Sequence, residues 1–535
     1  MNNKTKMTNT FEADYIIVGA GSAGCVLANR LSEQHSVLLI EAGPKDHAWD
    51  FRLHMPAALS QVLANDRYNW YYHSEPEAEL GGRRLYCPRG RVLGGSSSIN
   101  GMIYVRGNPE DFNQWARLLN DSNWNYENCL PYFKKSENSD AGDDEYRGRS
   151  GLLNVRQGKG DSPLFEAWQQ AGEQAGYARR ADLNGAQQEG VGLFDSTIFK
   201  GKRGSVARTY LHPVMDRDNL TVLTNQLVSK IEFDGDRAVG VRCGNRNSKG
   251  SQQVYRAGSE VIVCAGAINS PQLLMLSGLG DSEHLKENNI STKVHLPGVG
   301  QNLSDHLEIY VQYACKQPVS IYPALKWYRK PFVGLEWYLN QTGPGATNHF
   351  EAGGFLRSDA AKAYPDLQCH FLPVAMDYDG KQKHEGHGFQ VHVGPMKPTS
   401  RGSVTLQSPD PAQPPRIQFN YHQTEADKTV MRRGIEMVRV IIRQPAFKDL
   451  AGAELRPGNM AVDDFIREHA ESAYHPSCTC AMGSVVDSKA RVFGVENLRV
   501  VDASIMPEIT NGNLNAPVVM MAEKISDMIL GKPPL

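Results

Sequence analysis

The stretch DYIIVGAGSAGCVLANRLSEQHSVLLIEAG, residues 14–43, decides the fold of this 535-residue chain. Two short apolar runs, 15–18 and 37–40, enclose a glycine-rich turn and a segment whose apolar residues recur at helical spacing. That order predicts a strand, a turn, a helix and a second strand, which together form the βαβ unit that binds dinucleotides.

Individual residues of this stretch support the interpretation. Gly19 allows the tight turn, Gly21 lets the backbone approach a pyrophosphate, and Gly24 lets the helix pack on the strand. The helix N-terminus presents free N–H groups and the positive end of its dipole to the phosphates. Glu41 ends the second strand, 22 positions after Gly19 (41 − 19), where its carboxylate can accept hydrogen bonds from a ribose diol.

Composition limits the class of protein. A chain of this length is expected to form two or three lobes, and 40% hydrophobic with 22% charged residues is typical of a soluble globular protein. The net charge of −2 gives no electrostatic reason to expect nucleic acid or an anionic membrane as a partner.

Cysteine usage and the N-terminal residues bear on location. The nine cysteines are scattered and odd in number, which favours reduced thiols in a cytoplasmic enzyme. Cys478 and Cys480 form a CxC pair rather than the CxxC pairs of a structural zinc site, so we expect no metal. Residues 1–13 are polar and no apolar run is long enough to cross a bilayer. We therefore expect neither a signal peptide nor a transmembrane segment, and at most peripheral contact with the inner membrane.

The order of patterns along the chain predicts an α/β protein, α+β overall, with two domains. Strand-like runs at 309–315, 349–357, 367–373, 389–396 and 402–408 predict one antiparallel sheet, with helical patterns at 165–176, 426–444 and 462–470 around it. We assign 1–155, 202–308 and 470–535 to a discontinuous Rossmann-like nucleotide domain. Segments 156–201 and 309–469 are assigned to a substrate-binding domain.

Three further stretches share their motifs with one family. They are CPRGRVLGGSSSINGMIYVRGN (87–108), GAINSPQLLMLSGLG (266–280), and HPSCTCAMG with VVDASIMPEITNGNLNAP (475–483 and 500–517). The glycines of the first stretch suit a backbone that lies against a flat ligand. With residues 14–43 they resemble the glucose–methanol–choline (GMC) oxidoreductases, flavoproteins that oxidise alcohols, over nearly the whole chain. RYNWYY (67–72) and NHFEAGGF (348–355) are most similar to the choline-oxidising bacterial members.

The resemblance implies that the dinucleotide is FAD. Some relatives attach FAD covalently to a histidine, but Ile99 stands at the matching position and cannot form that bond, so we predict non-covalent FAD. The residues that match the cofactor site of the family are Gly19, Gly21, Ser22, Ala23, Gly24, Glu41, Ala42, Gly94, Gly95, Ser96, Asn100, Met102, Val228, Asp502, Ala503, Asn515 and Pro517.

The resemblance also implies two catalytic residues, His475 and Asn513. Oxidising a primary alcohol to the aldehyde removes a hydroxyl proton, which needs a base such as imidazole, and a hydride, which passes to flavin N5. Asn513 would hold the substrate oxygen and share its developing negative charge.

The expected substrate is a small alcohol whose identity the residues leave open. Phe350 and Tyr474 are candidate aromatic walls for a quaternary ammonium, and His370 matches a substrate-side histidine of the family. Choline-acting relatives carry a glutamate in the segment that matches 310–320, and an ungapped comparison puts Ala314 there. Glu351 is a candidate replacement for that charge.

Several alternatives follow. Without the glutamate, the substrate is a choline-like cation, a neutral alcohol or a hydroxy acid. Lys326, Arg329 and Lys330 add positive charge, which we interpret as a solvated face. The electrons can go to a quinone, a respiratory chain or a dye, or to oxygen in an oxidase. An NAD-dependent dehydrogenase, a flavin protein without turnover and a homodimer are also compatible with the residues alone.

Overall fold

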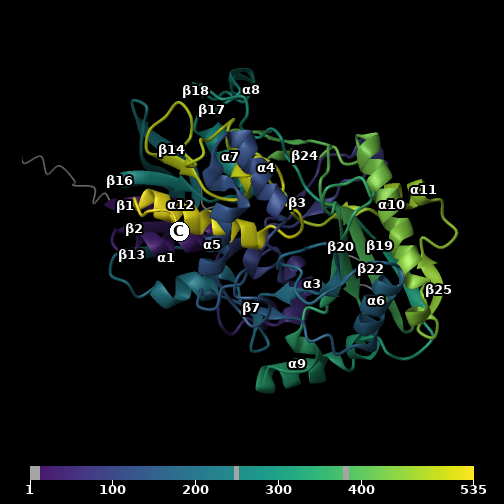
Figure 1. Cartoon of the computed structure of the whole chain (residues 1–535). Helices are drawn as coiled ribbons and strands as arrows, with labels where there is room; N and C mark the ends of the chain where they lie inside the picture. Colours follow the sequence, from purple (N-terminus) through teal and green to yellow (C-terminus); the bar gives the residue numbers. More distant parts are fainter. Residues whose placement is uncertain (1–11, 246–251, 378–384) are drawn as a thin grey trace, which may run out of the picture.

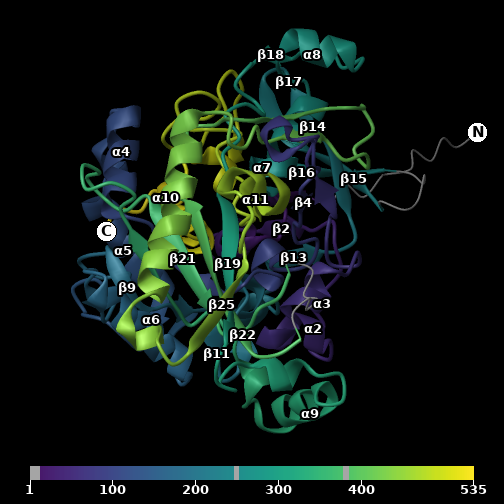
Figure 2. The same cartoon turned by 90° about the vertical axis from the view of Figure 1, so that its right-hand side faces the viewer.

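The computed structural model describes residues 12–245, 252–377 and 385–535. Residues 1–11, part of the segment in which we expect no signal peptide, lie outside the described residues. Two layered units form the body: one sheet lies among α1, α7 and α12, and a second sheet carries α6 and α10 on its outer face (Figures 1 and 2).

The 14–43 stretch folds as predicted. β1 (Glu12–Val18) and β2 (Val37–Ile40) are parallel neighbours with Tyr15 opposite Val37, and α1 (Ser22–Leu31) connects them. The helix buries residues 23–29 and Leu31, so protein covers it on nearly all sides and not only where it faces the sheet.

In the described part of the chain, the first sheet has seven strands. Its parallel part runs in the order β13 (Leu220–Leu223), β2, β1, β16 (Gln253–Val263) and β27 (Leu498–Val500). Two antiparallel strands, β15 (Arg237–Gly244) and β14 (Leu227–Asp234), extend it beyond β16. The mainly parallel order confirms the Rossmann-like fold class.

Helices on this sheet come from distant parts of the sequence. α12 (Asn515–Ile529) packs against α1 and against α5 (Tyr126–Ser136), and α7 (Gly266–Leu276) packs against β14. Their apolar faces and the strands share one buried hydrophobic cluster. The C-terminal helix therefore lies beside the first helix of the chain (Figure 1).

The second sheet has eight strands among the residues described. Its order is β25 (Ala451–Arg456), β19 (Leu307–Cys315), β22 (Gly388–Pro395), β21 (Leu367–Leu372), β20 (Ala352–Leu356), β9 (Gly190–Leu193) and β8 (Arg179–Arg180), with β26 (Glu471–Ser472) beside β19. Except for the β8–β9 pair, neighbours are antiparallel as predicted.

One predicted strand is misplaced. The run at 402–408 contains β23 (Ser403–Thr405), which pairs with β24 (Arg416–Gln418) in a separate two-stranded sheet instead of joining the large one. The predicted helices are present as α6 (Pro163–Gln174), α10 (Glu425–Ile442) and α11 (Val462–His469). α10 packs on β22 and α6 on β20 and β9, and this side shares a second hydrophobic cluster.

Shorter elements connect these units. The helices are α2 (Phe51–His54), α3 (Leu59–Leu63), α4 (Pro109–Leu119), α8 (Ser282–Glu287) and α9 (Lys330–Asn340), with single turns η1 (Pro56–Ala58), η3 (Gly95–Ser98), η7 (Tyr322–Leu325) and η8 (Pro344–Ala346). The strands are β3 (Tyr72–His73), β4 (Tyr86–Cys87), β5 (Ile103–Tyr104), β6 (Glu137–Ser139), β7 (Leu153–Gln157), β10 (Asp195–Ser196), β11 (Ile198–Phe199), β12 (Lys202–Arg203), β17 (Leu279–Gly280) and β18 (Val294–His295).

We keep the predicted domain boundaries as a proposal. β8 and β9 belong to segment 156–201 and lie in the second sheet, which supports grouping that segment with 309–469. β27 and α12 belong to segment 470–535 and pack with the first sheet, which supports grouping that segment with the nucleotide domain.

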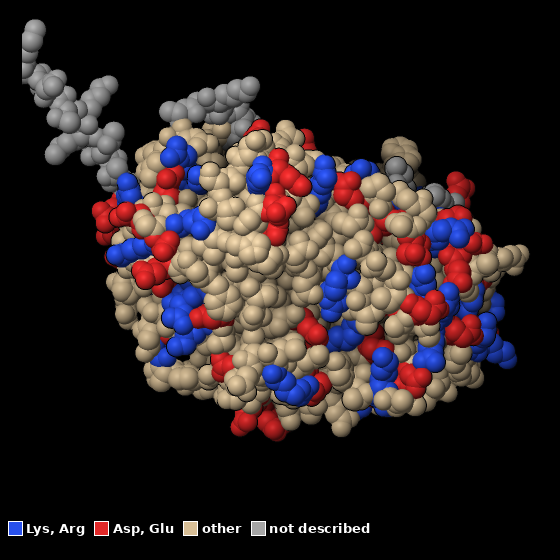
Figure 3. All heavy atoms as spheres, turned by 90° about the horizontal axis from the view of Figure 1, so that it is seen from above, with Lys and Arg blue, Asp and Glu red and all other residues tan. Residues whose placement is uncertain are grey.

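The surface mixes charges of both signs. On the face in Figure 3, Lys and Arg alternate with Asp and Glu over the whole outline. No helix among the described residues combines the length and apolar character needed to cross a membrane.

Candidate active site

A cavity of about 1390 Å³ lies between the two sheets. One side is lined by the glycine turn before α1, the end of β2 and the start of α7, and the other by residues of β19, β21 and β22. This volume exceeds that of an ordinary small-ligand site and suits a dinucleotide together with a small substrate.

The glycine turn has the geometry that the sequence predicts. Gly19 has φ +101°, and a Cβ there would lie 2.5 Å from the carbonyl oxygen of Cys264. A Cβ on Gly24 would lie 1.9 Å from the Gly19 oxygen. A Cβ on Gly21 would meet no atom nearer than 3.9 Å, so bare backbone faces the cavity at the N-terminus of α1. This arrangement fits a pyrophosphate.

Glu41 lies at the same edge of the sheet and lines the cavity. Its Oε2 accepts a hydrogen bond from the Ala20 amide (2.9 Å) and its Oε1 accepts one from the Gly43 amide (2.8 Å). Burial raises the pKa of Glu41 to about 7, against the effect of these two amides. A ribose diol that donates to this carboxylate would favour its ionised form.

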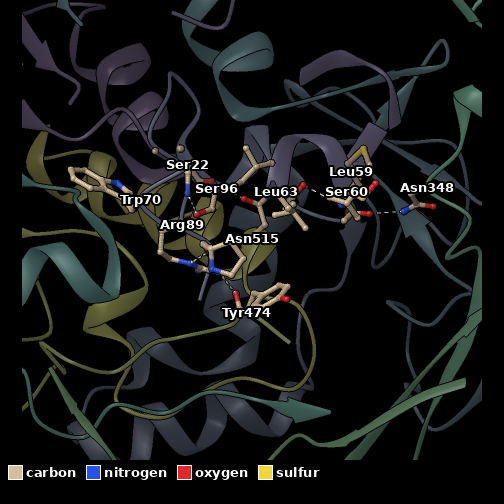
Figure 4. Close-up of a pocket in the computed structure, with 18 of the residues that line it drawn as sticks. Ser22, Leu59, Ser60, Leu63, Trp70, Arg89, Ser96, Asn348, Tyr474 and Asn515 are labelled. Atoms are coloured by element: carbon tan, nitrogen blue, oxygen red, sulfur yellow. Dashed lines mark hydrogen bonds between the residues drawn. The ribbon is translucent and has the colours of Figure 1, made fainter. Parts of the chain in front are cut away.

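Most predicted cofactor residues meet at this cavity. Ser22 Oγ donates to Asn515 Oδ1 at 2.7 Å, which joins α1 to α12, and both residues lie near Ser96 (Figure 4). The carboxylate of Asp502 accepts from the Gly266 amide (2.8 Å) and orders the start of α7. The lining residues among them are Gly19, Gly21, Ser22, Ala23, Glu41, Ala42, Gly95, Ser96, Asn100, Met102, Val228, Asp502, Ala503 and Asn515.

Three predicted cofactor residues do not line the cavity. Gly24 serves helix packing, and Gly94 lies behind the wall, where its amide donates to the Ala20 oxygen at 2.8 Å. Pro517 is buried in the first turn of α12. Their positions support the wall rather than a direct contact with the ligand.

The predicted catalytic pair is brought together. Asn513 Nδ2 lies 3.1 Å from His475 Nε2, although the residues are 38 positions apart in the chain. His475 Nδ1 lies 3.0 Å from Nδ1 of His306, and His306 Nε2 lies 3.1 Å from the carbonyl oxygen of Met396. Gln368 Nε2 donates to Asn513 Oδ1 at 3.3 Å.

This chain of contacts assigns the protons of both imidazoles. Because the Met396 carbonyl only accepts, His306 carries its proton on Nε2 and offers the Nδ1 lone pair to His475. His475 therefore carries its proton on Nδ1 and presents an unprotonated Nε2 to the cavity. The Asn513 amide has the matching polarity, since its oxygen accepts from Gln368 and its NH₂ donates to that nitrogen.

Burial keeps both rings neutral. Burial lowers the pKa of His306 to about 3. The pKa of His475 lies well below its ordinary value, mainly through burial and secondly through His306, His370 and Arg89. A neutral imidazole whose Nε2 carries no proton is the form that a general base requires.

The backbone at His475 is held in place by polar groups. Its amide donates to Asp305 Oδ1 at 2.6 Å, and Asp305 Oδ2 accepts from Ser472 Oγ at 2.5 Å. The preceding residue, Tyr474, has φ +67°, a region that non-glycine residues seldom adopt, and its carbonyl accepts from Arg89 Nη2 at 2.6 Å (Figure 4). These contacts fix the direction of the imidazole.

The expected substrate side contains a carboxylate that the sequence comparison missed. Glu308, on β19, lines the cavity with only 13% of its side chain exposed. Its Oε1 lies 2.9 Å from Nδ1 of His392 and its Oε2 3.9 Å from Nδ1 of His370. Burial lowers the pKa of His370 to about 4. Phe350 and Tyr474 line the same cavity as aromatic walls.

The ungapped comparison, which put Ala314 at the place of the relatives' glutamate and among the substrate-binding residues, is wrong. Ala314 pairs with Gly388 at the far end of β19 and does not line the cavity. Glu308 and Ala314 are six residues apart, so alternation puts them on the same face of the strand, roughly 20 Å from one another. Which of the two residues reaches the cavity depends on which end of β19 lies beside it, and the sequence does not give that.

Glu351 is not in the cavity either. Its Oε2 accepts from the Gly160 amide at 2.9 Å and its Oε1 from Thr347 Oγ1 at 2.6 Å. These contacts occupy both carboxylate oxygens in joining two loops. Glu351 therefore does not supply a negative charge to the cavity.

Sequence reasoning also missed His306 and Gln368. His306 follows Asp305 in the loop LPGVGQNLSDH (296–306). An Asp-His pair directly before a predicted strand is the sequence feature that could have identified His306 as a site residue. Gln368 gave no signal, because it lies in an apolar strand whose pairing alone brings it to Asn513.

Comparisons with known proteins agree with this site. The GMC oxidoreductase profiles match residues 13–308 and 398–522. The oxygen-dependent choline dehydrogenase of Burkholderia multivorans is 53% identical over 98% of this chain and 95% of its own length, and that of Yersinia pseudotuberculosis is 53% identical over 98% and 94%.

Solved structures show the same likeness. Pyridoxine 4-oxidase from Mesorbium loti superposes with a TM-score of 0.88 at 32% identity, covering 97% of this chain and 99% of that one. A formate oxidase of Aspergillus oryzae RIB40, described for its FAD modification, superposes with a TM-score of 0.90 at 26% identity over 97% and 98%. As its motifs predicted, the chain therefore belongs to the GMC oxidoreductase family of FAD-dependent enzymes, which act on the CH–OH group of alcohols.

Proposed function

We propose that this enzyme oxidises choline to its aldehyde. The observation that carries the proposal is Glu308, a largely buried carboxylate in the cavity. The two bacterial relatives named above carry the same activity in their names. A hydroxy acid would bring a second negative charge to this carboxylate, and a neutral alcohol would gain no electrostatic attraction from it.

Choline would place its ammonium against Glu308 and the aromatic walls. The faces of Phe350 and Tyr474 attract a quaternary ammonium, which cannot donate a hydrogen bond. His392, 2.9 Å from Glu308, fixes one oxygen and leaves the other toward His370. The carboxylate therefore orients the cation by charge.

The hydroxyl end of choline would meet His475 and Asn513. His475 Nε2 accepts the hydroxyl proton, and Asn513 Nδ2 donates a hydrogen bond to the oxygen as negative charge develops there. Because His475 donates its Nδ1 proton to His306, the ring cannot rotate to offer the wrong nitrogen. FAD, when bound, supplies the acceptor for the carbinol hydride, so the alcohol loses one proton and one hydride and becomes the aldehyde.

The residues that would hold FAD are those of the nucleotide side of the cavity. The amides at the start of α1 would bind its pyrophosphate and Glu41 its adenosine ribose. Ser96, Asn100 and Met102 lie along the remaining wall.

A pair of alcohols of equal shape tests the substrate. In the absence of oxygen, the second-order rate constant for bleaching of the flavin band should be at least about 100-fold higher with choline than with 3,3-dimethylbutan-1-ol, in which carbon replaces N⁺. Equal efficiencies for the two alcohols would refute choline as the substrate. Failure of both, with reduction by another alcohol, would refute choline while leaving the family assignment intact.

We expect FAD to leave the protein on acid precipitation. Ile99 lies at the end of η3, buried against Leu53 and Val92, and its hydrocarbon side chain offers no atom for a covalent link. The flavin absorbance should therefore appear in the supernatant after trichloroacetic acid treatment and centrifugation. A yellow pellet would contradict this prediction.

A further inference from the structure

The segment around α9 exposes an unusual number of large apolar side chains. Of the fourteen such side chains exposed among the described residues, six lie within 327–339. Trp327 is 83%, Tyr338 71% and Phe332 67% exposed. In both views of the molecule α9 projects from the body at its lower edge (Figures 1 and 2). We call this set the α9 face: Trp327, Tyr328, Phe332, Leu335, Tyr338 and Leu339.

The helix has two opposite stripes. Val333 and Trp337 point to the body, where Trp337 packs with Met55 and Ala58 and donates its indole N–H to the Gly201 oxygen at 2.7 Å. Phe332, Leu335 and Leu339, at spacings of three and four, lie on the opposite side. The helix is therefore anchored by one stripe and presents the other largely to solvent, since Phe332, Leu335 and Leu339 are 67%, 54% and 64% exposed. A patch of this kind marks an interaction surface.

Charge identifies the occupant. Lys326, Arg329 and Lys330 border the α9 face, against one acid, Glu336, on the helix. Arg329 and Lys330 form no salt bridge with any described residue. A second copy docked on this face about a twofold axis would bring the same positive charges together, which is unfavourable. Trp and Tyr beside Lys and Arg is instead the composition of segments that lie in an anionic bilayer interface.

We propose that the α9 face docks on the surface of an anionic lipid bilayer. The net charge of −2 for the whole chain gave no reason to expect this, because the positive charge is local. The same segment lines the cavity through Trp327, Lys330 and Tyr338, and two further exposed aromatic residues, Trp49 and Phe51, also line it. Docking therefore places the opening of the cavity at the lipid surface. The inference does not depend on the identity of the substrate.

Flotation of the FAD-loaded enzyme with lipid vesicles tests the proposal. The wild type should float with vesicles of phosphatidylcholine containing about one third phosphatidylglycerol, more weakly with pure phosphatidylcholine, and less at high salt. The triple variant Phe332→Ser, Leu335→Ser and Leu339→Ser should bind the anionic vesicles at least about tenfold more weakly. None of these three residues lines the cavity, so flavin reduction by the alcohol should be unchanged.

A matched control and a second variant keep the test decisive. Leu118→Ser, an equally exposed leucine on α4, should float like the wild type. Arg329→Glu, which removes no apolar contact, should weaken binding to anionic vesicles about fivefold or more and leave binding to neutral vesicles unchanged. Absence of flotation by the wild type, or equal flotation of the triple variant, would overturn the proposal. So would a wild-type dimer that the triple variant converts to a monomer, since a second copy would then cover the face.

Discussion

Replacing His475 with alanine should lower the rate of alcohol-dependent flavin reduction by roughly 10²- to 10⁴-fold, the range for loss of a general base. In the wild type, three contacts hold His475. Its ring contacts His306 through Nδ1 (3.0 Å) and Asn513 through Nε2 (3.1 Å), and its backbone amide donates to Asp305 (2.6 Å). Stopped-flow measurement of flavin bleaching without oxygen reports the step directly. FAD content should stay normal, because the nucleotide side of the cavity is untouched.

The pH dependence gives an independent test of the same role. The pKa of His475 is lowered by burial, so its neutral, proton-accepting form persists below the ordinary imidazole value of about 6.5. The reduction rate of the wild type should therefore stay level as pH falls through 6.5 and decline only at lower pH. His295→Ala, an exposed histidine that contacts Ser282, is the matched control and should keep the wild-type rate. Undiminished reduction by His475→Ala would show that the base is another group.

Replacing Glu308 with glutamine should raise the KM for choline by roughly 10²- to 10³-fold. Removing one member of a largely buried charge pair costs about 3–5 kcal/mol, and Glu308 exposes only 13% of its side chain. Glutamine keeps the shape and one accepting oxygen, which can still face His392, so the main loss is the charge. Steady-state kinetics with choline and with 3,3-dimethylbutan-1-ol measures the effect. The neutral alcohol should be used no worse than by the wild type, which reverses or abolishes the preference for choline.

Glu351→Gln is the matched control for this substitution. It changes a carboxylate that binds Gly160 and Thr347 outside the cavity. The ratio of the two kcat/KM values should stay at the wild-type level in this variant. If Glu351→Gln changed that ratio and Glu308→Gln did not, the carboxylate assignment and the choline proposal would both fail, while the family assignment would stand.

Local sequence was sufficient for the nucleotide side of the site. β1, α1 and β2 have the order predicted from residues 14–43. Gly19 and Gly24 stand where a Cβ would clash, and Gly21 leaves the backbone bare toward the cavity. Glu41 follows at the strand end and lines the cavity. Local patterns failed for 402–408, because a strand-like run does not say which sheet it will join.

The motif residues of the sequence therefore determined the dinucleotide fold and the family, and resemblance to that family supplied FAD and the prediction that His475 acts with Asn513. Tertiary structure alone decided the rest. His306 meets His475 across 169 residues and so selects its proton position, and β19 brings Glu308 rather than Ala314 to the cavity. Alternation along a strand predicts on which face of the sheet each side chain lies. Which end of the strand reaches the substrate depends on how the two sheets pack together.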